Sequence, residues 1–547
     1  MRAMAFRKRL MIQQRKEGYT MRYKKRGTYQ NLEEYIYAKT GWHGSKRYQD
    51  FYHLEGLVYA ADRIMHAVKT REHIEIYTDY DADGVGATAE IILILRKLGA
   101  KNYKVTVPRR FSDGYGLQER HVSQMRGGLL ITIDNGISAI LAIQKAKANN
   151  MDVIVLDHHL APVHQGEIIL PNADIIIDPA ALPYGNDFVG YCGAGLVNCL
   201  GRYLFPNDRE FQAKLASIAA VSTIADNVPL LEDNCRIVQE GLWAINHNMA
   251  TAGLQAVMRL NELAGHVTSE DLAYCVAPIF NAPGRLYDKG ALLSAATMFT
   301  ENQEKAEAYA AQISAANEQR KQVTKQIMDH LDYDADQMIN IIRVNEHIPG
   351  ILGLIAGRIA ENTKKPTFVY CIHNGIATGS ARTDDGNNVK AMLDSVQGML
   401  IKYGGHVAAA GFSFYQYNEL QIIQALRGYP VTPYQEEYFY DLDIKPEDSV
   451  NLLHRMSILE PFGKEVERPV FRMECRFEGK SFWKPMGNGE HISFKLGELK
   501  AAGFYMRDAF KQAGYPDHIV FYGDLNWNWY KGNPYPNFRI QDFETVI

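Results

Sequence analysis

The chain has 547 residues, a length that predicts several domains rather than one hydrophobic core. Hydrophobic residues make up 46% of it and charged residues 22%, which is ordinary for a soluble globular protein. The formal net charge of −4 excludes an overall basic field that would by itself indicate a nucleic-acid partner.

Six cysteines are scattered along the chain without any C-x-x-C pair. This spacing argues against a zinc ribbon or a disulfide scaffold and fits a reducing cytoplasm. No apolar run approaches the ~18 residues of a membrane span, and the N-terminus lacks the apolar segment of a secretory signal. We therefore expect a cytoplasmic protein that does not enter a membrane.

Residues 1–53 form a basic N-terminal arm. The first 26 residues contain ten Lys or Arg and a single acid, Glu17. Such an arm is either a solvated tail or a nucleic-acid contact, and the composition leaves both readings open.

From residue 54 to about residue 290, helical segments alternate with short apolar strands. This alternation predicts a parallel sheet with helices on both faces, and ligands of such sheets bind beyond the carboxyl ends of the strands. The expected strands are Ile74–Tyr77, Tyr103–Val107, Leu129–Ile133, Val153–Leu156 and Ile175–Ile177.

Acids and histidines directly follow three of these strands, as Asp79–Asp83, Asp134 and Asp157–His159. Asp81 and Asp83 alternate in an extended segment, so their carboxylates would repel each other without a cation or protons between them. Carboxylates clustered with imidazole nitrogens suit a pair of divalent ions, Mn²⁺ or Mg²⁺. The competing reading of an Asp before a helix is an N-cap. If the loops converge, the chain is a metal-dependent phosphoesterase.

Three further regions follow the first domain. Residues 291–335 contain no Gly or Pro as far as Leu331 and predict one long connecting helix. Residues 336–430 predict a smaller α/β domain. Residues 434–547 alternate apolar and polar residues between turn signals, which predicts a small β-barrel. Its Trp and Tyr residues, with interleaved Lys, fit either single-strand binding or a barrel core.

Taken in order, these motifs resemble those of the DHH phosphoesterase superfamily, and more closely the RecJ-type single-strand-specific exonucleases. The resemblance runs from about residue 54 to 415 and more weakly through the tail. It implies a parallel-sheet DHH domain, a DHHA1-type substrate-binding domain joined by the long helix, and an OB-like nucleic-acid-binding domain. The segments that carry it are the DYDADG, ITIDNGIS and VLDHH loops, Ala225–Leu230, Cys192–Gly195, Asn281–Leu286, Pro349–Arg358, Gly379–Arg382 and Gly404–His406.

The resemblance also implies a role for each matching residue. Asp81 and Asp134 would hold one metal ion, while the second ion would be held by a set of four side chains. His159 would face the scissile phosphate, and Asp157 would support the histidines. The four ligands of the second ion would be Asp83, Asp134, His158 and Asp226.

Five further residues are expected to contact substrate phosphate by resemblance. Ser380, Arg382 and His406 would grip phosphate from the second domain, because a planar guanidinium matches phosphate oxygens. Arg110 and Arg285 are candidates for the terminal phosphate, or else ordinary surface arginines.

One position departs from the family. Tyr77 stands where many members have a histidine, four residues before the first ligand aspartate. A phenol is a poor ligand at neutral pH because its pKa is near 10. The first metal site is therefore expected to be weaker, or completed by water.

The activity implied is a single-strand-specific DNA exonuclease, 5′ to 3′ by resemblance alone, that releases nucleotides in recombination or repair. Two alternatives remain: a phosphodiesterase of the same superfamily for oligonucleotides or cyclic dinucleotides, and a non-catalytic DHH-like DNA-binding scaffold. The β-rich tail argues against the first, and the complete set of expected ligands argues against the second. Expected partners are single-stranded DNA and a helicase or single-strand-binding protein, with the chain as a monomer.

Overall fold

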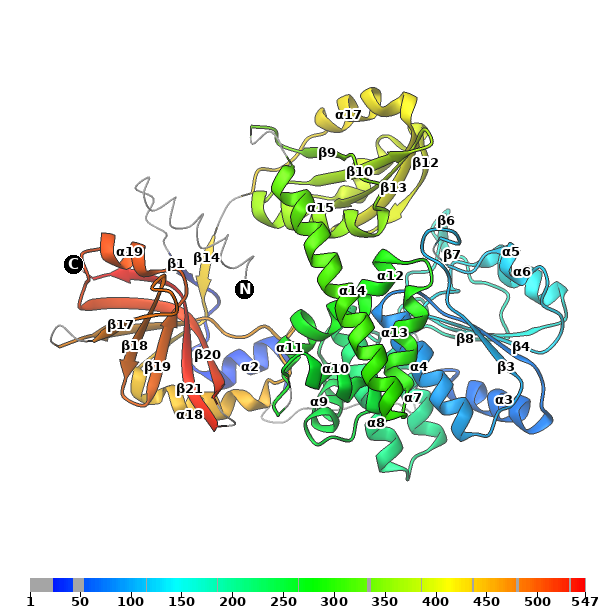
Figure 1. Cartoon of the computed structure of the whole chain (residues 1–547), viewed down its shortest axis with the longest axis horizontal. Coiled ribbons are helices and arrows are strands. Elements are labelled where there is room, and N and C mark those ends of the chain that lie inside the picture. The colour runs from blue at the N-terminus through cyan, green and yellow to red at the C-terminus, as the bar shows by residue number, and fades with distance from the viewer. Residues whose placement is uncertain are drawn as a thin grey trace. The chain divides into compact units, whose positions relative to one another are not determined.

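The computed structural model describes residues 23–42, 54–114, 116–183, 185–263, 265–331, 336–384, 386–434, 437–478, 482–530 and 533–546. The chain forms two compact units (Figure 1). The first unit contains residues 39–320 and 458–467, and the second contains the segments before, between and after them. Most of the predicted basic arm, residues 1–22 and 43–53, lies outside the described residues.

The first unit is built on a five-stranded parallel sheet, as the alternating pattern predicts. Every residue of the inner strands β2 and β4 is buried, because these strands, apolar except for Glu75 and Thr132, are covered on both faces. From β2 the chain moves outward to β3, returns to β4 and continues in the opposite direction. This reversal creates a crevice at the carboxyl ends of β2 and β4. In spatial order the strands are β3 (Tyr103–Thr106), β2 (Ile74–Tyr77), β4 (Leu129–Ile133), β5 (Asp152–Leu156) and β8 (Ile175–Ile177).

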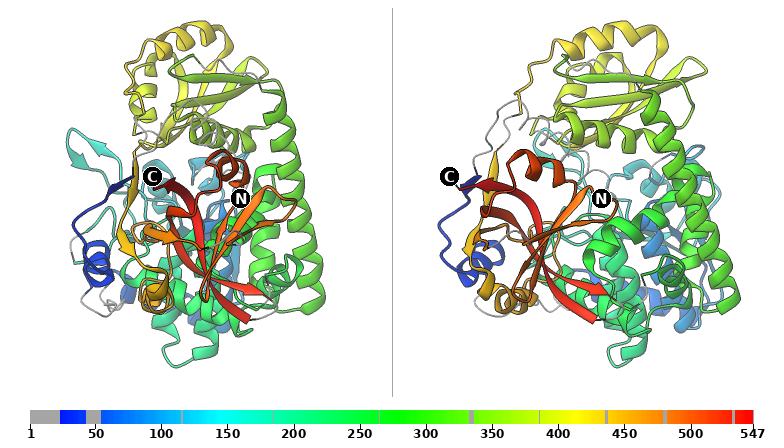
Figure 2. Two further views of the ribbon diagram at one scale, coloured as in Figure 1. Left: turned by 90° about the vertical axis from the view of Figure 1, so that its left-hand side faces the viewer. Right: turned by 60° about the vertical axis from the view of Figure 1, so that its left-hand side comes forward.

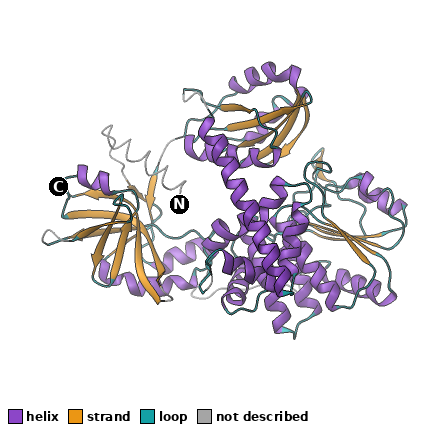
Figure 3. Cartoon of the chain, in the orientation of Figure 1, coloured by secondary structure: helices purple, strands orange, loops and turns teal. Residues whose placement is uncertain are grey.

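Helices cover both faces of this sheet, with α5 and α6 on one side and α3 on the other (Figure 1). Helix α4 is buried along nearly its whole length against α7, α8 and α13, within the purple helical cluster of Figure 3. None of the described helices is long and apolar enough to cross a membrane. The helices and the small hairpin are α3 (Leu57–Thr70), α4 (Ala82–Lys97), α5 (Glu119–Val122), α6 (Ile140–Ala148), β6 (Val163–His164), β7 (Glu167–Ile168), α7 (Gly193–Leu204), α8 (Arg209–Ala225), α9 (Glu232–Asn246), α10 (Ala252–Leu260), α11 (Ser269–Asp271), η2 (Leu272–Val276), α12 (Ala277–Leu286) and α13 (Gly290–Phe299).

The long connecting helix is present, but it does not extend over the whole of 291–331 as expected. Two helices occupy this stretch, α13 and α14 (Gln303–His330). Thr300 is extended, with ψ of 134°, and its carbonyl accepts a hydrogen bond from the Gly253 N–H at 3.1 Å. The Asn302 side chain then accepts from the Lys305 N–H at 2.9 Å, which caps the start of the new helix. The chain thus leaves the helical path at Thr300, where a tertiary hydrogen bond forms, although the sequence has no Gly or Pro at this point.

The second unit contains a mixed five-stranded sheet in the order β12-β13-β11-β10-β9. Only β9 and β10 pair in parallel, and α15 packs on β10 and β11. The smaller α/β architecture predicted for this stretch is thus present. The elements are β9 (Asn340–Val344), α15 (Pro349–Thr363), β10 (Thr367–His373), β11 (Ile376–Arg382), α16 (Val389–Asp394), β12 (Leu400–Gly405), β13 (Ala409–Tyr415) and α17 (Glu419–Arg427).

The C-terminal segment forms a seven-stranded mixed sheet in the order β15-β16-β20-β21-β19-β18-β17. Its long strands β20 and β21 are the red pair in Figure 2. The core is filled by phenylalanines such as Phe494, Phe521 and Phe538, whereas Trp529 is exposed and Trp483 is half-buried against Tyr515. The elements are β15 (Leu442–Ile444), α18 (Ser449–Arg455), β16 (Phe471–Arg476), β17 (Trp483–Met486), β18 (His491–Leu496), β19 (Leu499–Gly503), α19 (Arg507–Gln512), β20 (His518–Tyr530) and β21 (Asn533–Thr545).

The described end of the basic arm is a strand. Strand β1 (Tyr23–Lys25) pairs in parallel with β14 (Tyr438–Tyr440), and α2 (Leu32–Thr40) follows it. Its cations are paired with acids of the same unit: Lys24 with Glu437, Lys25 with Asp443 and Arg26 with Asp441. At these three positions the basic charge serves a structural contact within the chain.

Candidate metal centre

The loops that carry the predicted ligands converge at the crevice of the parallel sheet. Asp79–Asp83 follow β2, Asp134 follows β4 and Asp157–His159 follow β5. Asp226 arrives separately, as the first residue after α8. The structure therefore brings together all the residues expected to hold metal or act in catalysis.

Three groups of side chains place ligand atoms within 4.8 Å of one another. The first group is Asp83, His158 and Asp226, the second is Asp79, Asp81 and Asp134, and the third is Asp134, His158 and His159. Asp134 belongs to two groups, which fits the bridging position expected of it. Asp79, to which the sequence analysis gave no ligand role, lies directly in the second group.

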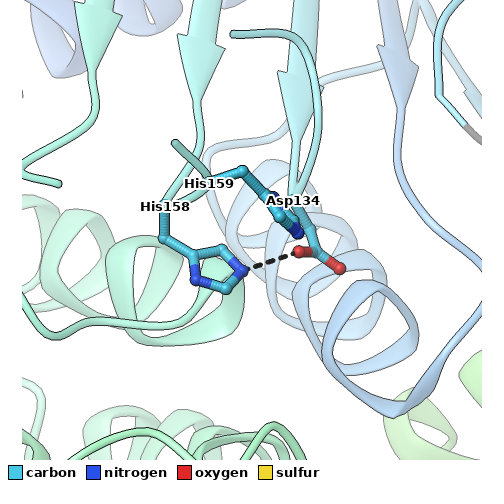
Figure 4. Close-up of side chains that lie close together, drawn as sticks. All are labelled: Asp134, His158 and His159. Atoms are coloured by element: carbon cyan, nitrogen blue, oxygen red, sulfur yellow. Dashed lines mark hydrogen bonds and ion pairs between the residues drawn. The ribbon is translucent and has the colours of Figure 1, made fainter. Parts of the chain in front are cut away.

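His158 lies close to three of the acids, of which Figure 4 shows Asp134. Its Nε2 lies 3.0 Å from Asp134 Oδ1 and 3.7 Å from Asp83 Oδ2. Its Nδ1 lies 3.8 Å from Asp226 Oδ2. Burial lowers the pKa of His158, against the raising effect of Asp83, so the imidazole favours the neutral form that binds metals.

Asp134 has a backbone conformation that is uncommon for a residue with a side chain, with φ of 60°. Its N–H donates to the Leu156 carbonyl at 2.9 Å, which ties the turn after β4 to the end of β5. The first residue of α7, Gly193, permits this turn, because a Cβ there would lie 2.7 Å from the Asp134 Cβ. Backbone strain of this kind is characteristic of functional sites.

Two of the acids are held by helix N-termini. The Asp83 carboxylate accepts from the N–H groups of Gly193, at 2.6 Å, and Ala194, at 2.9 Å, at the start of α7. Asp81 caps α4 by accepting from the N–H groups of Asp83, at 3.0 Å, and Gly84, at 3.1 Å. Asp81 is thus an N-cap, as the alternative interpretation predicted, and its carboxylate also belongs to the ligand group with Asp79 and Asp134. Helix N-termini carry partial positive charge, which orients these carboxylates.

Burial and mutual repulsion disfavour ionisation of all these carboxylates at neutral pH unless positive charge is added. Burial and the neighbouring acids raise the pKa of Asp79 to about 8 and that of Asp226 to about 8. Burial and then the charge of Asp83 raise the pKa of Asp134 well above its usual value. The buried Asp79 Oδ1 has no hydrogen-bond partner among the described residues. These oxygen donors with one imidazole fit Mn²⁺ or Mg²⁺, and cations would relieve the repulsion.

His159 differs from His158 because Asp157 holds it. The His159 Nδ1 lies 2.7 Å from Asp157 Oδ1, and the buried Asp157 also accepts from the Ile137 N–H at 2.9 Å. Burial alone would lower the pKa of His159, but the hydrogen bond and charge of Asp157 outweigh it and raise the pKa to about 9. His159 therefore presents a positive charge at neutral pH, which suits an anionic substrate.

Tyr77 occupies the position of the missing histidine without entering the site. It is fully buried, and its hydroxyl lies 3.2 Å from both the Gly116 carbonyl oxygen and His121 Nδ1. Burial raises its pKa, so the phenol stays neutral. Among the described residues, Asp79 and not Tyr77 completes a ligand group with Asp81 and Asp134.

Asp178 is a buried acid near Asp157 and His159 that the sequence motifs did not mark. It is the first residue after β8, it is buried, and its Oδ1 accepts from the Ala181 N–H at 2.9 Å. Burial and then the charge of Asp157 raise its pKa to about 7. The rule that located the other acids, a carboxylate just past a parallel strand, would have found it too.

The five candidate phosphate contacts fall into two groups, one in each unit. In the first unit, Arg110 lies over the ring of Tyr80, and Arg285 is in the last turn of α12. In the second unit, Ser380 and Arg382 alternate on β11, and the His406 N–H donates to the Ala409 carbonyl beside them. Burial lowers the pKa of Arg382.

Known families match the chain in three stretches. Residues 73–223 match the DHH family, N-terminal domain; residues 339–428 match the DHHA1 domain; and residues 440–542 match the RecJ OB domain.

Curated relatives span much of the chain. The single-stranded-DNA-specific exonuclease RecJ of Bacillus subtilis is 28% identical over 516 residues, 90% of this chain and 64% of that protein. The Escherichia coli protein of the same name is 29% identical over 455 residues, 76% of this chain and 78% of that one. The chain thus spans less than two thirds of the Bacillus relative.

A solved structure has the same fold. The crystal structure of RecJ in complex with Mn²⁺ from Thermus thermophilus matches with a TM-score of 0.74 at 25% identity, covering 90% of this chain and 72% of that one.

Proposed function

The chain belongs to the RecJ family of the DHH superfamily, and from this we propose that it is a metal-dependent exonuclease of single-stranded DNA. The observation that carries the proposal is the convergence of Asp83, Asp134 and His158 at the crevice of the sheet. Relatives named for this activity, one of them solved with Mn²⁺, support it. The 5′ to 3′ direction comes from the family.

The metal ligands are divided between two ions. Asp79, Asp81 and Asp134 would hold one ion, and Asp83, Asp134, His158 and Asp226 the other. When bound, two such ions activate a water and neutralise the charge that develops on the phosphate.

The remaining side chains bind and orient the substrate. The His159 imidazolium contacts a phosphate oxygen, and Asp157 fixes the orientation of its ring through the 2.7 Å hydrogen bond. Water adds to phosphorus, and the 3′ oxygen of the released nucleotide leaves with a proton. The shortened strand therefore again begins with a 5′ phosphate. Arg110 and Arg285 bind that terminal phosphate, while Ser380, Arg382 and His406 bind the backbone that follows.

The biological setting follows from the family in the same way. We place the protein in the cytoplasm, as a monomer acting in DNA recombination or repair, with a helicase or a single-strand-binding protein as its partner. We also propose the domain bounds expected from the sequence, with 54–290 as the catalytic domain, 336–430 as the substrate-binding domain and 434–547 as the OB-like domain.

The test uses oligonucleotides labelled at the 5′ or the 3′ end, single-stranded or paired, with Mn²⁺, Mg²⁺ or EDTA. We expect metal-dependent loss of single strands only, with the 5′ label released first as a mononucleotide. Degradation of cyclic dinucleotides alone would favour the alternative phosphodiesterase. Binding of DNA without cleavage in either metal would favour the scaffold and overturn the proposal.

A further inference from the structure

Tyr80 separates two acids of the metal centre, yet neither the sequence motifs nor the ligand groups give it a role. Its neighbours Asp79 and Asp81 belong to one ligand group. Its ring lies under Arg110, whose guanidinium carbon is 4.0 Å from the ring centroid. An arginine stacked on an aromatic face is held by the attraction of the cation for the ring. One residue therefore links the metal loop to a cation outside it.

Arg110 is a cation without an acidic partner in the described part of the chain. No carboxylate of that part lies within ion-pair distance, and its buried Nε has no hydrogen-bond acceptor. Arginines in proteins are usually paired when their polar atoms are buried, so an unpaired guanidinium beside a substrate crevice is suited to bind an anion.

Helix α12 brings Arg285 to the same place. A Cβ on Gly284 would lie 2.9 Å from the Tyr80 carbonyl oxygen, so only glycine lets the helix end against this backbone. The Ala82 N–H also donates to Asn281 Oδ1 at 3.0 Å. Burial raises the pKa of Tyr80 to about 12, while both Arg110 and Arg285 act to lower it, as cations near the phenol do.

The segment that carries Arg110 is tied to the chain just after Arg285. Asp288 accepts from the Ser112 hydroxyl at 2.9 Å and from the Phe111 N–H at 3.2 Å. The two arginines are thus fixed relative to each other by Asp288, and relative to the acids by Tyr80.

We propose that Tyr80 is a positioning residue that fixes the spacing between a terminal phosphate on Arg110 and the acids that hold the metal ions. This inference rests on the proposed function, and it adds a residue that determines the length of the released product. Because one aromatic side chain spans the gap, the site accommodates a single nucleotide between the arginine-bound phosphate and the phosphodiester that is cleaved. Without the ring face, Arg110 is no longer held in place. The protein then prefers a 5′ phosphate less strongly, and the position of the cleaved bond varies.

The test compares Tyr80→Leu, which removes the ring face, with Tyr80→Phe, which keeps it. Substrates are thymidine oligonucleotides that begin with a 5′ phosphate or a 5′ hydroxyl. For Tyr80→Leu we expect KM for the phosphorylated substrate to rise about 2- to 30-fold, the range of a cation–π contact. KM for the hydroxyl substrate stays unchanged, and dinucleotide products appear. Tyr80→Phe restores phosphate selection and mononucleotide release.

Two controls separate positioning from general damage. Mn²⁺ binding measured by calorimetry stays unchanged in Tyr80→Leu, and Tyr59→Leu, at an exposed tyrosine of α3, changes none of the measurements. The inference is overturned if Tyr80→Leu keeps the normal preference for a 5′ phosphate and the normal product length. It is also overturned if this variant loses Mn²⁺ binding together with binding of both substrates.

A readout without catalysis keeps the inference distinct from the proposed function. Fluorescence anisotropy in EDTA compares binding of the two oligonucleotides. We expect wild-type protein to prefer the phosphorylated one and Tyr80→Leu to lose that preference. If wild-type protein binds with this preference but cleaves nothing, the proposed function fails while the role of Tyr80 stands; equal preference in both proteins overturns that role.

Discussion

The Asp134 carboxylate lies in a buried site with Asp83, Asp81 and Asp79, and its pKa is raised by burial and then by their charges. Without cations the folded protein therefore holds repelling groups together, and this cost grows as pH rises above the usual carboxyl range. We expect Asp134→Asn to raise the melting temperature of the EDTA-treated protein by about 2–4 °C for each kcal/mol relieved.

The same substitution should abolish function. Removing a ligand shared by two ions is expected to lower the Mn²⁺-dependent nuclease rate by more than about 100-fold, since even outer contacts to a metal ligand contribute 10–100-fold. Mn²⁺ should also no longer raise the melting temperature. Asp271→Asn, at the capping box of α11, serves as the matched control. A variant that is less stable in EDTA yet fully active would contradict the assignment.

The His159–Asp157 pair gives a pH dependence of known sign. The pKa of His159 is raised from 6.5 to about 9, so its stabilisation is complete below about pH 6.5 and is lost as pH rises through about 9. The pKa of Asp157 is lowered, so its part is lost only on acidification, outside this window. The His159 side chain is 35% exposed, which screens the pair to about 1–2 kcal/mol.

The measurement is the melting temperature in EDTA between pH 6.5 and 9. We expect the wild-type value to fall by about 2–6 °C more than that of His159→Gln over this range. His66→Gln, on an exposed face of α3, should behave like wild type. Parallel pH profiles for wild type and His159→Gln would refute the ion pair.

The start of α7 offers a matched pair of glycines. A Cβ on Gly193 would lie 2.7 Å from the Asp134 Cβ and 3.1 Å from Asp83 Oδ2, whereas a Cβ on Gly195 meets nothing closer than 3.6 Å. We expect Gly193→Ala to cost about 1–3 kcal/mol by overpacking and to weaken Mn²⁺ binding. Gly195→Ala should be neutral or stabilising, because alanine favours helices. Calorimetric Mn²⁺ titration and thermal unfolding of both variants check this, and equal effects would refute it.

Sequence patterns located the strands and acids that obey local rules. Ile74–Tyr77 and Leu129–Ile133 are buried apolar runs, so composition and length fix both ends, and their following acids mark the sheet edge. The hydrogen bond from the Gly193 N–H to Asp83 could not be predicted from local patterns, because the two residues are 110 positions apart. The Thr300 carbonyl at the break accepts a hydrogen bond from distant Gly253, which no local pattern encodes, whereas the Asn302 N-cap that starts α14 is a local signal.

The contacts around strand β1 could not be predicted from local patterns either, because they join residues far apart in the sequence. Basic composition alone suggested a tail or a nucleic-acid contact, but Arg26 forms two hydrogen bonds to Asp441, at 2.8 and 3.0 Å, across 415 positions. The Asp441 carboxylate is completely buried and also accepts from the Val470 N–H, just before β16. Residues 23–26 are therefore part of the structure that supports the C-terminal sheet.

Breaking this pair should destabilise the C-terminal sheet and spare the metal centre. Arg26→Ala leaves the buried Asp441 charge uncompensated, which we expect to cost about 2–3 kcal/mol, less than a fully buried pair because Arg26 is partly exposed. Lys24→Ala removes an ion pair exposed on both sides and should cost almost nothing. Hydrogen exchange should quicken over residues 437–478 in Arg26→Ala alone, while Mn²⁺ still raises the melting temperature. Equal protection in both variants would mean that β1 only rests on the sheet, and a lost Mn²⁺ response would mean that the N-terminal strand also supports the metal centre.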